Sequence, residues 1–298
     1  MSAPPIQDER FRIEMTVGCG DAASIPKVLG AGRIMRRDGC EVQLMHNGVT
    51  VVAGGYYGDW MTEIIRRLSG HHEPQEEAVF HEIMKHMPES PTMIELGAFW
   101  SYYSLWCLQV RPAARVIGVE PDPHHLDIGK QNARLNGREI DFVNALAGGE
   151  TLPPRPFQTE KSGLVELPQV SVPDIMGSRG LKQLDILHCD TQGAETAVLT
   201  SCFELLKEGA IRFCVVSTHH HRISGDPLTH QRCVAIIEQA GGQILAEHDV
   251  AESFSGDGLI AAYFGSEPIH WMDVKLSYNR YSTSLFRNPL FDLSERAR

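Results

Sequence analysis

Residues 93–104 read Met-Ile-Glu-Leu-Gly-Ala-Phe-Trp-Ser-Tyr-Tyr-Ser, and this stretch decides the fold. It opens with an apolar run, breaks at Gly97 shortly after the acid Glu95, and resumes in residues that suit a helix. That order predicts a strand, a tight loop and a helix. In an open α/β sheet, the turn after such a strand lies at the carboxyl edge, where small ligands bind.

The loop lacks the third glycine of a dinucleotide fingerprint, because Ser101 stands at that position. Aromatic residues at positions 99, 100, 102 and 103 crowd the turn, and we assign them neither to packing nor to a pocket. Gly97 allows close approach of the backbone to a ligand. The acid at the strand end favours a cationic or hydroxyl-bearing ligand over a phosphate. The pattern E-x-G-x-x-x-S resembles motif I of class I S-adenosylmethionine-dependent methyltransferases.

Composition narrows the range of possible functions. The net charge of -11 argues against an electrostatic grip on nucleic acid and favours a small-molecule substrate. No run approaches the roughly 18 apolar residues of a membrane span, and the N-terminus lacks the pattern of a signal peptide. We therefore expect a cytoplasmic protein. The seven cysteines have no C-x-x-C spacing, which argues against a zinc-cysteine site or a disulfide framework.

We divide the chain into an N-terminal extension (1–72), a catalytic domain (73–266) and a tail (267–298). In the extension, residues 1–30 are expected to form an irregular arm. Two β-prone runs around Asn47-Gly48 predict a hairpin, and Trp60 to Leu68 predicts a short helix. The aromatic tail could dock on the domain, close over the substrate or contact another subunit of a homo-oligomer.

His71 and His72 precede a proline that suits the first turn of a helix. The segment is either a capped helix that packs on the core or a lid that carries the two histidines to the substrate. We favour the packed helix and keep substrate contact as the alternative.

Residues 115–119 predict the second buried strand, which ends in Glu120. An acid about 20 residues after the glycine loop is placed to accept hydrogen bonds from two ribose hydroxyls. The third strand and its exit are expected at 140–147, where Asn144 or a nearby backbone group could bond the adenine edge. Residues 148–173 are expected to be an excursion with a possible short strand at 164–167.

An apolar strand at 184–189 delivers Asp190 to the same edge, and Gly193-Ala194-Glu195 follows. Acid, two residues, then Gly-Ala-Glu is similar to the L-K-x-D-x-E-G-A-E signature of the FkbM family of methyltransferases. Glu-Leu-Gly-Ala (95–98) and Glu-Pro-Asp-Pro (120–123) resemble that family's other two motifs, and the resemblance spans roughly residues 91–265. Two residues depart from it: His188 replaces the usual lysine and Gln192 the usual first glutamate. Any catalytic role at these two positions is therefore in question.

The resemblance implies that S-adenosylmethionine lies near Glu95, Gly97, Ala98 and Ser101, with its ribose at Glu120. Asp190 would lie near the reacting methyl group and also belong to the cofactor site. Gln192 is a candidate substrate contact.

The strand expected at 211–217 ends in Thr218 and three histidines at the edge that carries Asp190. If the strand extends that far, His219 and His221 share a face and His220 faces away; we keep His220 as a candidate substrate contact. A neutral histidine could accept the proton of a substrate hydroxyl. Alternatively, Asp190 and histidines could hold a divalent metal, which we do not favour. The histidines could also merely shape the loop.

Together these patterns predict a doubly wound, Rossmann-like α/β domain with a hairpin and helix extension. The family resemblance adds a seven-stranded sheet whose last strand is antiparallel. It favours O-methylation of a hydroxyl on a sugar or natural-product intermediate by in-line displacement. N-methylation is the nearest alternative, and a binding module without turnover is another. The missing glycine disfavours a nucleotide-dependent oxidoreductase.

Overall fold

A seven-stranded sheet forms the centre of the computed structural model, which describes residues 9–37, 39–266 and 274–279. The strands lie in the order β12-β13-β11-β10-β4-β5-β6. Their bounds are β4 Thr92–Leu96, β5 Arg115–Val119, β6 Asp141–Val143, β10 Leu184–Cys189, β11 Ile211–Thr218, β12 Gln243–His248 and β13 Gly258–Tyr263. Strand β13 pairs antiparallel with both β11 and β12. The other five strands, β11, β10, β4, β5 and β6, run parallel to one another. The predicted doubly wound sheet is confirmed.

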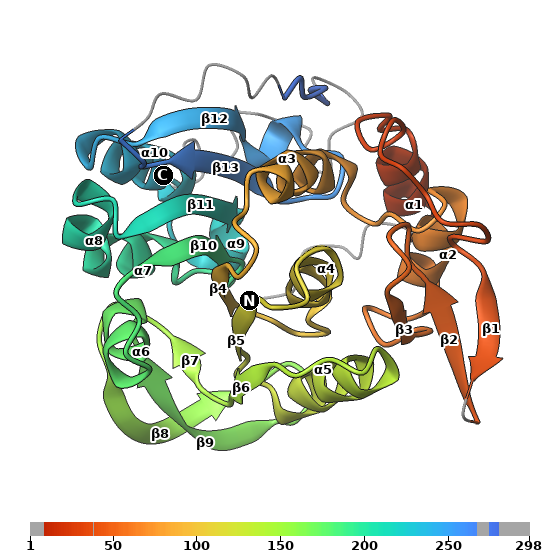
Figure 1. Cartoon of the computed structure of the whole chain (residues 1–298), viewed down its shortest axis with the longest axis horizontal. Coiled ribbons are helices and arrows are strands. Elements are labelled where there is room, and N and C mark those ends of the chain that lie inside the picture. The colour runs from red at the N-terminus through yellow and green to blue at the C-terminus, as the bar shows by residue number, and fades with distance from the viewer. Residues whose placement is uncertain (1–8, 38, 267–273, 280–298) are drawn as a thin grey trace.

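Helices cover both faces of this sheet (Figure 1). One face carries α3 Pro74–Lys85, α4 Tyr102–Val110 and α5 Pro123–Leu135. The other carries α6 Val172–Ser178, α7 Glu195–Ser201, α8 Phe203–Lys207 and α10 Thr229–Gln239. Two short elements, α9 His221–Ser224 and η1 Val250–Glu252, lie in the loops near the carboxyl edge. The helix expected after His72 is confirmed as α3.

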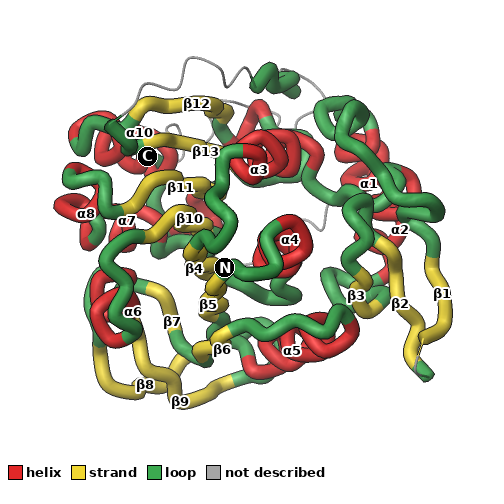
Figure 2. Tube along the Cα trace, viewed as in Figure 1, coloured by secondary structure: helices red, strands yellow, loops and turns green. Residues whose placement is uncertain are grey.

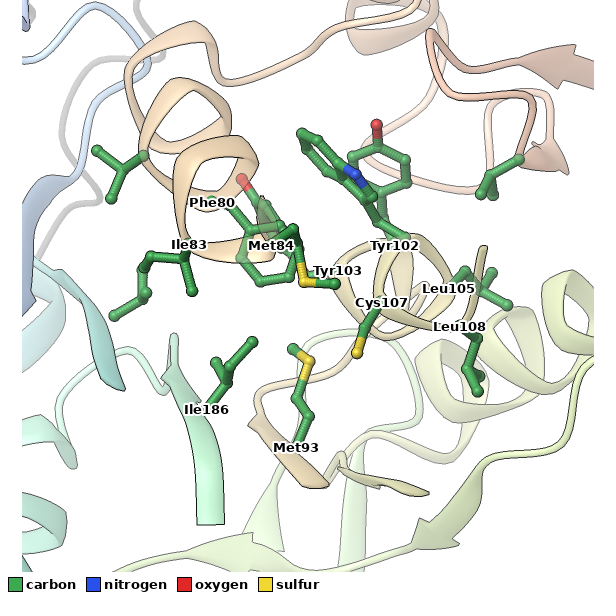
Figure 3. Packing of buried hydrophobic residues seen from close by; sticks show 14 of the residues in the cluster. Phe80, Ile83, Met84, Met93, Tyr102, Tyr103, Leu105, Cys107, Leu108 and Ile186 are labelled. Carbon is green, nitrogen blue, oxygen red and sulfur yellow. The ribbon is translucent and has the colours of Figure 1, made fainter. Parts of the chain in front are cut away.

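Helix α4 is buried almost all round, with residues 102–108 nearly inaccessible. Its Tyr103 packs against Phe80 of α3, with ring centroids 4.9 Å apart, and its Cys107 lies near Met93 of the sheet (Figure 3). Fully burying one such apolar side chain stabilises a fold by about 1.5–3 kcal/mol. The outer side of α4 packs against residues of the extension, including Ile64. An apolar helix can therefore follow the glycine loop without exposing a hydrophobic face.

The N-terminal extension contains a three-stranded antiparallel sheet beside α5 (Figure 2). Its elements are α1 Glu9–Val17, β1 Ile34–Arg37, β2 Cys40–Leu44, β3 Thr50–Val52 and α2 Asp59–Arg67. The predicted hairpin is confirmed as β2 and β3, and the predicted helix as α2. The expectation of an irregular arm over residues 1–30 is wrong where α1 forms. The charges of its sequence ERFRIEMTV conceal a helix that buries Met15.

A second small sheet, in the order β7-β9-β8, covers part of the carboxyl edge. It consists of β7 Leu146–Ala147, β8 Leu152–Gln158 and β9 Leu164–Val170. Residues 148–173 were expected to be an excursion with a possible short strand at 164–167; that strand is confirmed as the start of β9, and the excursion itself forms part of a paired sheet. The three prolines of β8 conceal the strand, but β8 lies at the edge of its sheet, where proline is tolerated.

The described part of the tail, residues 274–279, packs on the domain. The Asn279 amide donates to the Ser253 carbonyl at 2.9 Å, and Gln75 Nε2 donates to the Ser277 carbonyl at 2.8 Å. Tyr278 is exposed. The other aromatic residues singled out in the tail, Trp271, Tyr281, Phe286 and Phe291, lie outside the described residues. No helix in the described ranges is long and apolar enough to cross a membrane.

The loops after β4 and β10 come close together at the point where the strand order reverses. Gly97 has φ of +77°, and a Cβ built on it would lie 1.6 Å from the carbonyl oxygen of Asp190. Only a residue without a Cβ fits this space. The Asp190 amide donates to the Leu96 carbonyl at 2.9 Å, which fixes the crossing.

We expect Gly97→Ala to lower the free energy of unfolding by about 3 kcal/mol, because it combines left-handed strain with a backbone clash. Gly137→Ala is the matched control, since Gly137 has φ of +60° but no atom within 4 Å of the added Cβ. Strain alone should cost the control about 1 kcal/mol. Urea unfolding of both variants measures the difference, and equal losses would contradict the clash.

Candidate functional site

A cavity of about 460 Å³ opens at the carboxyl edge of the sheet. Its walls come from the loops after β4, β5 and β10, from the β7-β9-β8 sheet, and from the extension. Predicted site residues that line it are Glu95, Gly97, Ala98, Glu120, Asp190, Gln192 and His72. Ser101, Asn144, His71, His219, His220 and His221 are not among the described lining residues. The sequence thus predicted which edge of the sheet carries the cavity, but it did not predict where the individual histidines lie.

Glu95 lies at the floor of the cavity and is 3% exposed. It accepts hydrogen bonds from the amide of Ser104, at 3.1 Å, and from the Ser104 hydroxyl. Burial raises the pKa of Glu95 to about 7. Ser101 turns away from the cavity: a Cβ on Gly129 of α5 would lie 2.6 Å from the Ser101 hydroxyl.

Glu120 is held in place by backbone donors. Its two carboxylate oxygens accept one bond each, from the amides of Phe99 at 3.0 Å and Asp122 at 2.9 Å. Asn144 stands behind it, and its side-chain amide donates to the carbonyls of Glu120 and Pro121 at 2.8 and 2.9 Å. Asn144 thus braces the end of β5.

Asp122 fastens the β8–β9 hairpin over the cavity. Its carboxylate accepts from the amides of Lys161 at 2.6 Å and Ser162 at 3.2 Å, both in the hairpin turn. Partial burial opposes ionisation, but these hydrogen bonds hold the pKa of Asp122 well below its ordinary value. The fastened hairpin places Phe157 in the wall of the cavity.

His219 lies between carboxylates. Its Nε2 is 3.1 Å from Asp190 Oδ1, and its Nδ1 is 2.8 Å from Glu195 Oε1. Asp257 Oδ1 is 3.6 Å from the same Nε2. Burial lowers the pKa of His219, but the carboxylates outweigh burial and raise it well above the ordinary value. The carboxylates thus favour the protonated imidazole, which argues against the neutral base considered from the sequence.

The predicted pairing of His219 with His221 on one strand face is wrong. Strand β11 ends at Thr218, and His221 is the first residue of α9. The His220 ring caps that helix by accepting from the Arg222 amide at 3.3 Å. The chain turns here because a helix follows within three residues, so the alternation of a strand does not apply.

His71 and His72 are buried and belong to no lid. His72 Nδ1 is 2.6 Å from Glu77 Oε1, and His72 Nε2 is 3.2 Å from Glu73 Oε2. Burial lowers the pKa of His72, but the two glutamates raise it to about 10. His71 bonds the other oxygen of Glu77. Of the two histidines, only His72 lines the cavity within the described chain.

His188, which replaces the family lysine, pairs with α3. Its Nε2 is 2.7 Å from Glu76 Oε1, and the Ser217 hydroxyl donates to Glu76 Oε2 at 2.7 Å. Burial lowers the pKa of His188, but the bond to Glu76 outweighs burial and raises it. Gln192, which replaces the family glutamate, has φ of +55° and donates to the Tyr57 hydroxyl at 3.3 Å.

Among the described residues, the grouping compact enough for a metal is His46, His71 and Glu77, not Asp190 with its histidines. The two histidine rings stack with centroids 4.1 Å apart and planes 18° from parallel. Imidazole lone pairs lie in the ring plane, so stacked rings do not converge on one ion. Glu77 is also engaged by His71 and His72. The donor set does not fit a metal.

Among the residues of the site that were not predicted from the sequence are Tyr56, Tyr57, Glu73 and Asp257. The first three line the cavity, and Asp257 faces His219. The run Gly54-Gly55-Tyr56-Tyr57-Gly58 was a signal, because two aromatic residues between glycines rarely serve as a simple turn. The residues around Asp257 are typical of an ordinary turn, and nothing nearby in the sequence marked Asp257 as a site residue.

Residues 82–244, more than half of the chain, match the model of the methyltransferase FkbM domain. The chain belongs to the FkbM methyltransferase family. It is thus an S-adenosylmethionine-dependent methyltransferase, and the resemblance noted from its motifs is confirmed. No curated protein matches this FkbM sequence.

Solved structures similar to this FkbM protein include methyltransferase FkbM from Methylobacillus flagellatus KT, with 18% identity and a TM-score of 0.44. That match covers 68% of this chain and 54% of the other. A precorrin-6y C5,15-methyltransferase from Geobacter metallireducens GS-15 has 14% identity, a TM-score of 0.42 and coverage of 64% and 87%. TrmK of M. capricolum, solved with S-adenosylhomocysteine, has 12% identity, a TM-score of 0.38 and coverage of 64% and 70%.

We expect His219 of this FkbM enzyme to keep protons on both ring nitrogens at pH 8. Nitrogen NMR of histidine-labelled protein, assigned with His219→Gln, measures this. The folded pKa exceeds the unfolded value of about 6.5, so the stabilisation is complete below pH 6.5. It is lost as pH rises through the folded pKa. His219→Gln should thus cost about 3 kcal/mol at pH 6.5 and less at pH 9. A resonance with a midpoint near 6.5 would contradict this.

Proposed function

We propose that this FkbM enzyme transfers the methyl group of S-adenosylmethionine to a hydroxyl of a small molecule held in the cavity. One observation supports this most: Glu120 and Asp190, which end strands on the two sides of β4, face the same cavity with the glycine loop between them. The cavity wall also contains aromatic side chains, among them Tyr56, Tyr57 and Trp100. The cavity thus offers a polar place for a nucleoside and an apolar place for an acceptor.

In this proposal the cofactor lies along the loops after β4 and β5. Glu120 accepts one backbone bond at each oxygen, which leaves lone pairs for the two ribose hydroxyls. Gly97 and Ala98 admit the methionine part, and buried Glu95 lies beneath it. Leu146 and Ala147, together with the fastened hairpin, form the wall that would cover the adenine. Asn144 acts by bracing Glu120 rather than by touching the base.

The acceptor lies against Tyr56, Tyr57 and Trp100. Tyr56 and Trp100 stack with centroids 4.5 Å apart, which makes a rigid wall. Methyl transfer depends on holding the nucleophile, methyl carbon and sulfur in line at close range. A rigid wall opposite the glycine loop supplies that constraint and excludes water.

Asp190 is the proposed hydrogen-bond acceptor for the substrate hydroxyl. It lines the cavity, and His219 fixes its orientation from behind. His219 positions Asp190 and takes no proton itself, because both of its ring nitrogens already face carboxylates. For the same reason His219 is not offered as a metal ligand.

We expect titration calorimetry to show binding of S-adenosylmethionine and S-adenosylhomocysteine but not of NAD. Glu120→Gln should weaken both by about 10- to 100-fold, since it removes charge-assisted bonds worth about 1.5–3 kcal/mol. Asp127→Asn on α5 is the control, because Asp127 is exposed and pairs only with Lys130 in the described chain. Thermal unfolding without ligand checks that Glu120→Gln folds.

Transfer of labelled methyl to a panel of hydroxyl compounds then tests the reaction. Absence of binding by either sulfur cofactor would overturn the proposal. Transfer to nitrogen alone would replace O-methylation by N-methylation, and binding without any transfer would favour a module without turnover.

A further inference from the structure

The acceptor end of the cavity carries more negative than positive charge. The carboxylates in the cavity wall are Glu73, Glu95, Glu120, Asp122, Glu160 and Asp190. Arg155 is the only Lys or Arg among the described lining residues, and it lies in β8, where it donates to Gln169 at 2.7 Å. Arg155 therefore lies in the half of the cavity proposed to hold the cofactor. The half proposed to hold the acceptor has no Lys or Arg in the described wall.

The histidines in the wall and behind it do not remove this excess, because deeper carboxylates engage them: His188, which lines the cavity, bonds buried Glu76 at Nε2. His72 bonds buried Glu77 at one ring nitrogen and Glu73 at the other. His219 likewise lies between buried Glu195 and Asp190. Glu73 and Asp190, which line the cavity, therefore each share their histidine with a deeper carboxylate.

Two further basic side chains lie near the cavity but are not among its described lining residues. His71 bonds the second oxygen of Glu77 and does not line the cavity. Arg12 packs 4.7 Å over the Trp60 ring and acts electrostatically on Asp257. Neither reaches the Glu73 carboxylate in the hydrogen bonds and ion pairs of the described chain.

The cofactor accounts for only part of the excess. S-adenosylmethionine carries a sulfonium, an ammonium and a carboxylate, hence one net positive charge. Glu95 and Asp190 lie by the glycine loop, where those groups are proposed to bind. Glu73 is the N-cap of α3 and bonds Tyr56 and Tyr103, so it belongs to the acceptor side.

Glu73 is built to receive one more donor. Its Oε2 accepts from Tyr103 at 3.2 Å and from His72, whereas its Oε1 accepts only a long 3.4 Å bond from Tyr56 within the described chain. A carboxylate has about four lone-pair sites, so Oε1 can accept a further hydrogen bond, and Glu73 lines the cavity. Burial raises the pKa of Glu73, although His72 opposes this. A bound cation would lower that pKa and so favour the carboxylate form.

The surrounding rings suit a cation as well. Tyr56, Tyr57, Phe99, Trp100 and Tyr103 all line this part of the cavity. Aromatic faces attract ammonium groups, more strongly where water is excluded. A carboxylate beside aromatic rings is a common way to select an amine over a neutral analogue of the same shape.

We propose that the methyl acceptor carries an ammonium group and that Glu73, together with the aromatic wall, binds it. The acceptor class is then an amino-bearing hydroxyl compound, such as an amino sugar or a phenolic amine. The inference rests on the proposed function, since it assigns a substrate class to that cavity. Glu73 lies before residue 82, outside the segment that matches the family model.

The test compares amines with neutral partners of the same shape on the full chain saturated with S-adenosylhomocysteine. The probes are glucosamine against glucose and tyramine against 4-ethylphenol, measured by calorimetry. In at least one pair the amine should bind about tenfold more tightly or better, as expected for a charge-assisted bond. Glu73→Gln should abolish the preference, and Glu73→Asp should retain part of it.

Glu82→Gln is the matched control: it makes the same substitution in α3, at a residue that pairs with Lys85 and does not line the cavity. The control should keep the amine preference, and thermal unfolding verifies each variant. Equal binding within both pairs, tighter binding of the neutral partners, no binding by any probe, or a preference that survives Glu73→Gln would each overturn the proposal. The proposed function is tested separately by the binding of S-adenosylhomocysteine. If S-adenosylhomocysteine does not bind, the proposed function fails, and the amine and neutral probes are compared on the enzyme without cofactor.

Discussion

The approach of Gly97 to the Asp190 carbonyl is the contact on which the site depends. Strands β4 and β10 are neighbours in the sheet, and the chain leaves them on opposite faces. Both loops must therefore pass through the same narrow space at the carboxyl edge. A side chain at position 97 would separate them, and the cavity would lose the alignment of Glu120 with Asp190. The strand order creates the place for a ligand, and the missing Cβ lets both loops occupy it.

A layer of buried histidine and carboxylate groups supports the cavity from behind. Burying such charges costs several kcal/mol for each ion, and the mutual attraction of the partners repays this only when the geometry is good. This layer therefore contributes little net stability. Its effect is orientation: Glu73 and Asp190 are each held by an imidazolium whose other nitrogen is fixed by a deeper carboxylate. A site built in this way has few alternative rotamers for the two acids that face the ligand.

The sequence was sufficient for the central sheet because strands β4, β5 and β10 are largely apolar runs with an acid near their carboxyl ends. That signal is local. The histidines were harder to place because their roles depend on distant residues: His188 meets Glu76, and His219 meets both Glu195 and Asp257. Whether His221 joined His219 depended on where β11 ended, a boundary that three consecutive polar residues do not define. Strand β8 and helix α1 were missed for another reason, since prolines and charges hide elements whose formation depends on tertiary packing.

At position 188 a histidine replaces the lysine of the family signature, and the positive charge there then depends on a neighbouring residue. The signature that the chain resembles has a lysine there, which is cationic without help. Burial alone would favour the neutral form of a histidine at that position, and Glu76 of α3 opposes this by accepting a hydrogen bond from Nε2, which raises the pKa of His188. Glu76 precedes the segment that matches the family model. The positive charge beneath the cavity thus depends on α3 being packed against the sheet. Residues before the matched segment supply Glu73 to the wall and Glu76 to the layer behind it, so the site is complete only when the domain and α3 fold together.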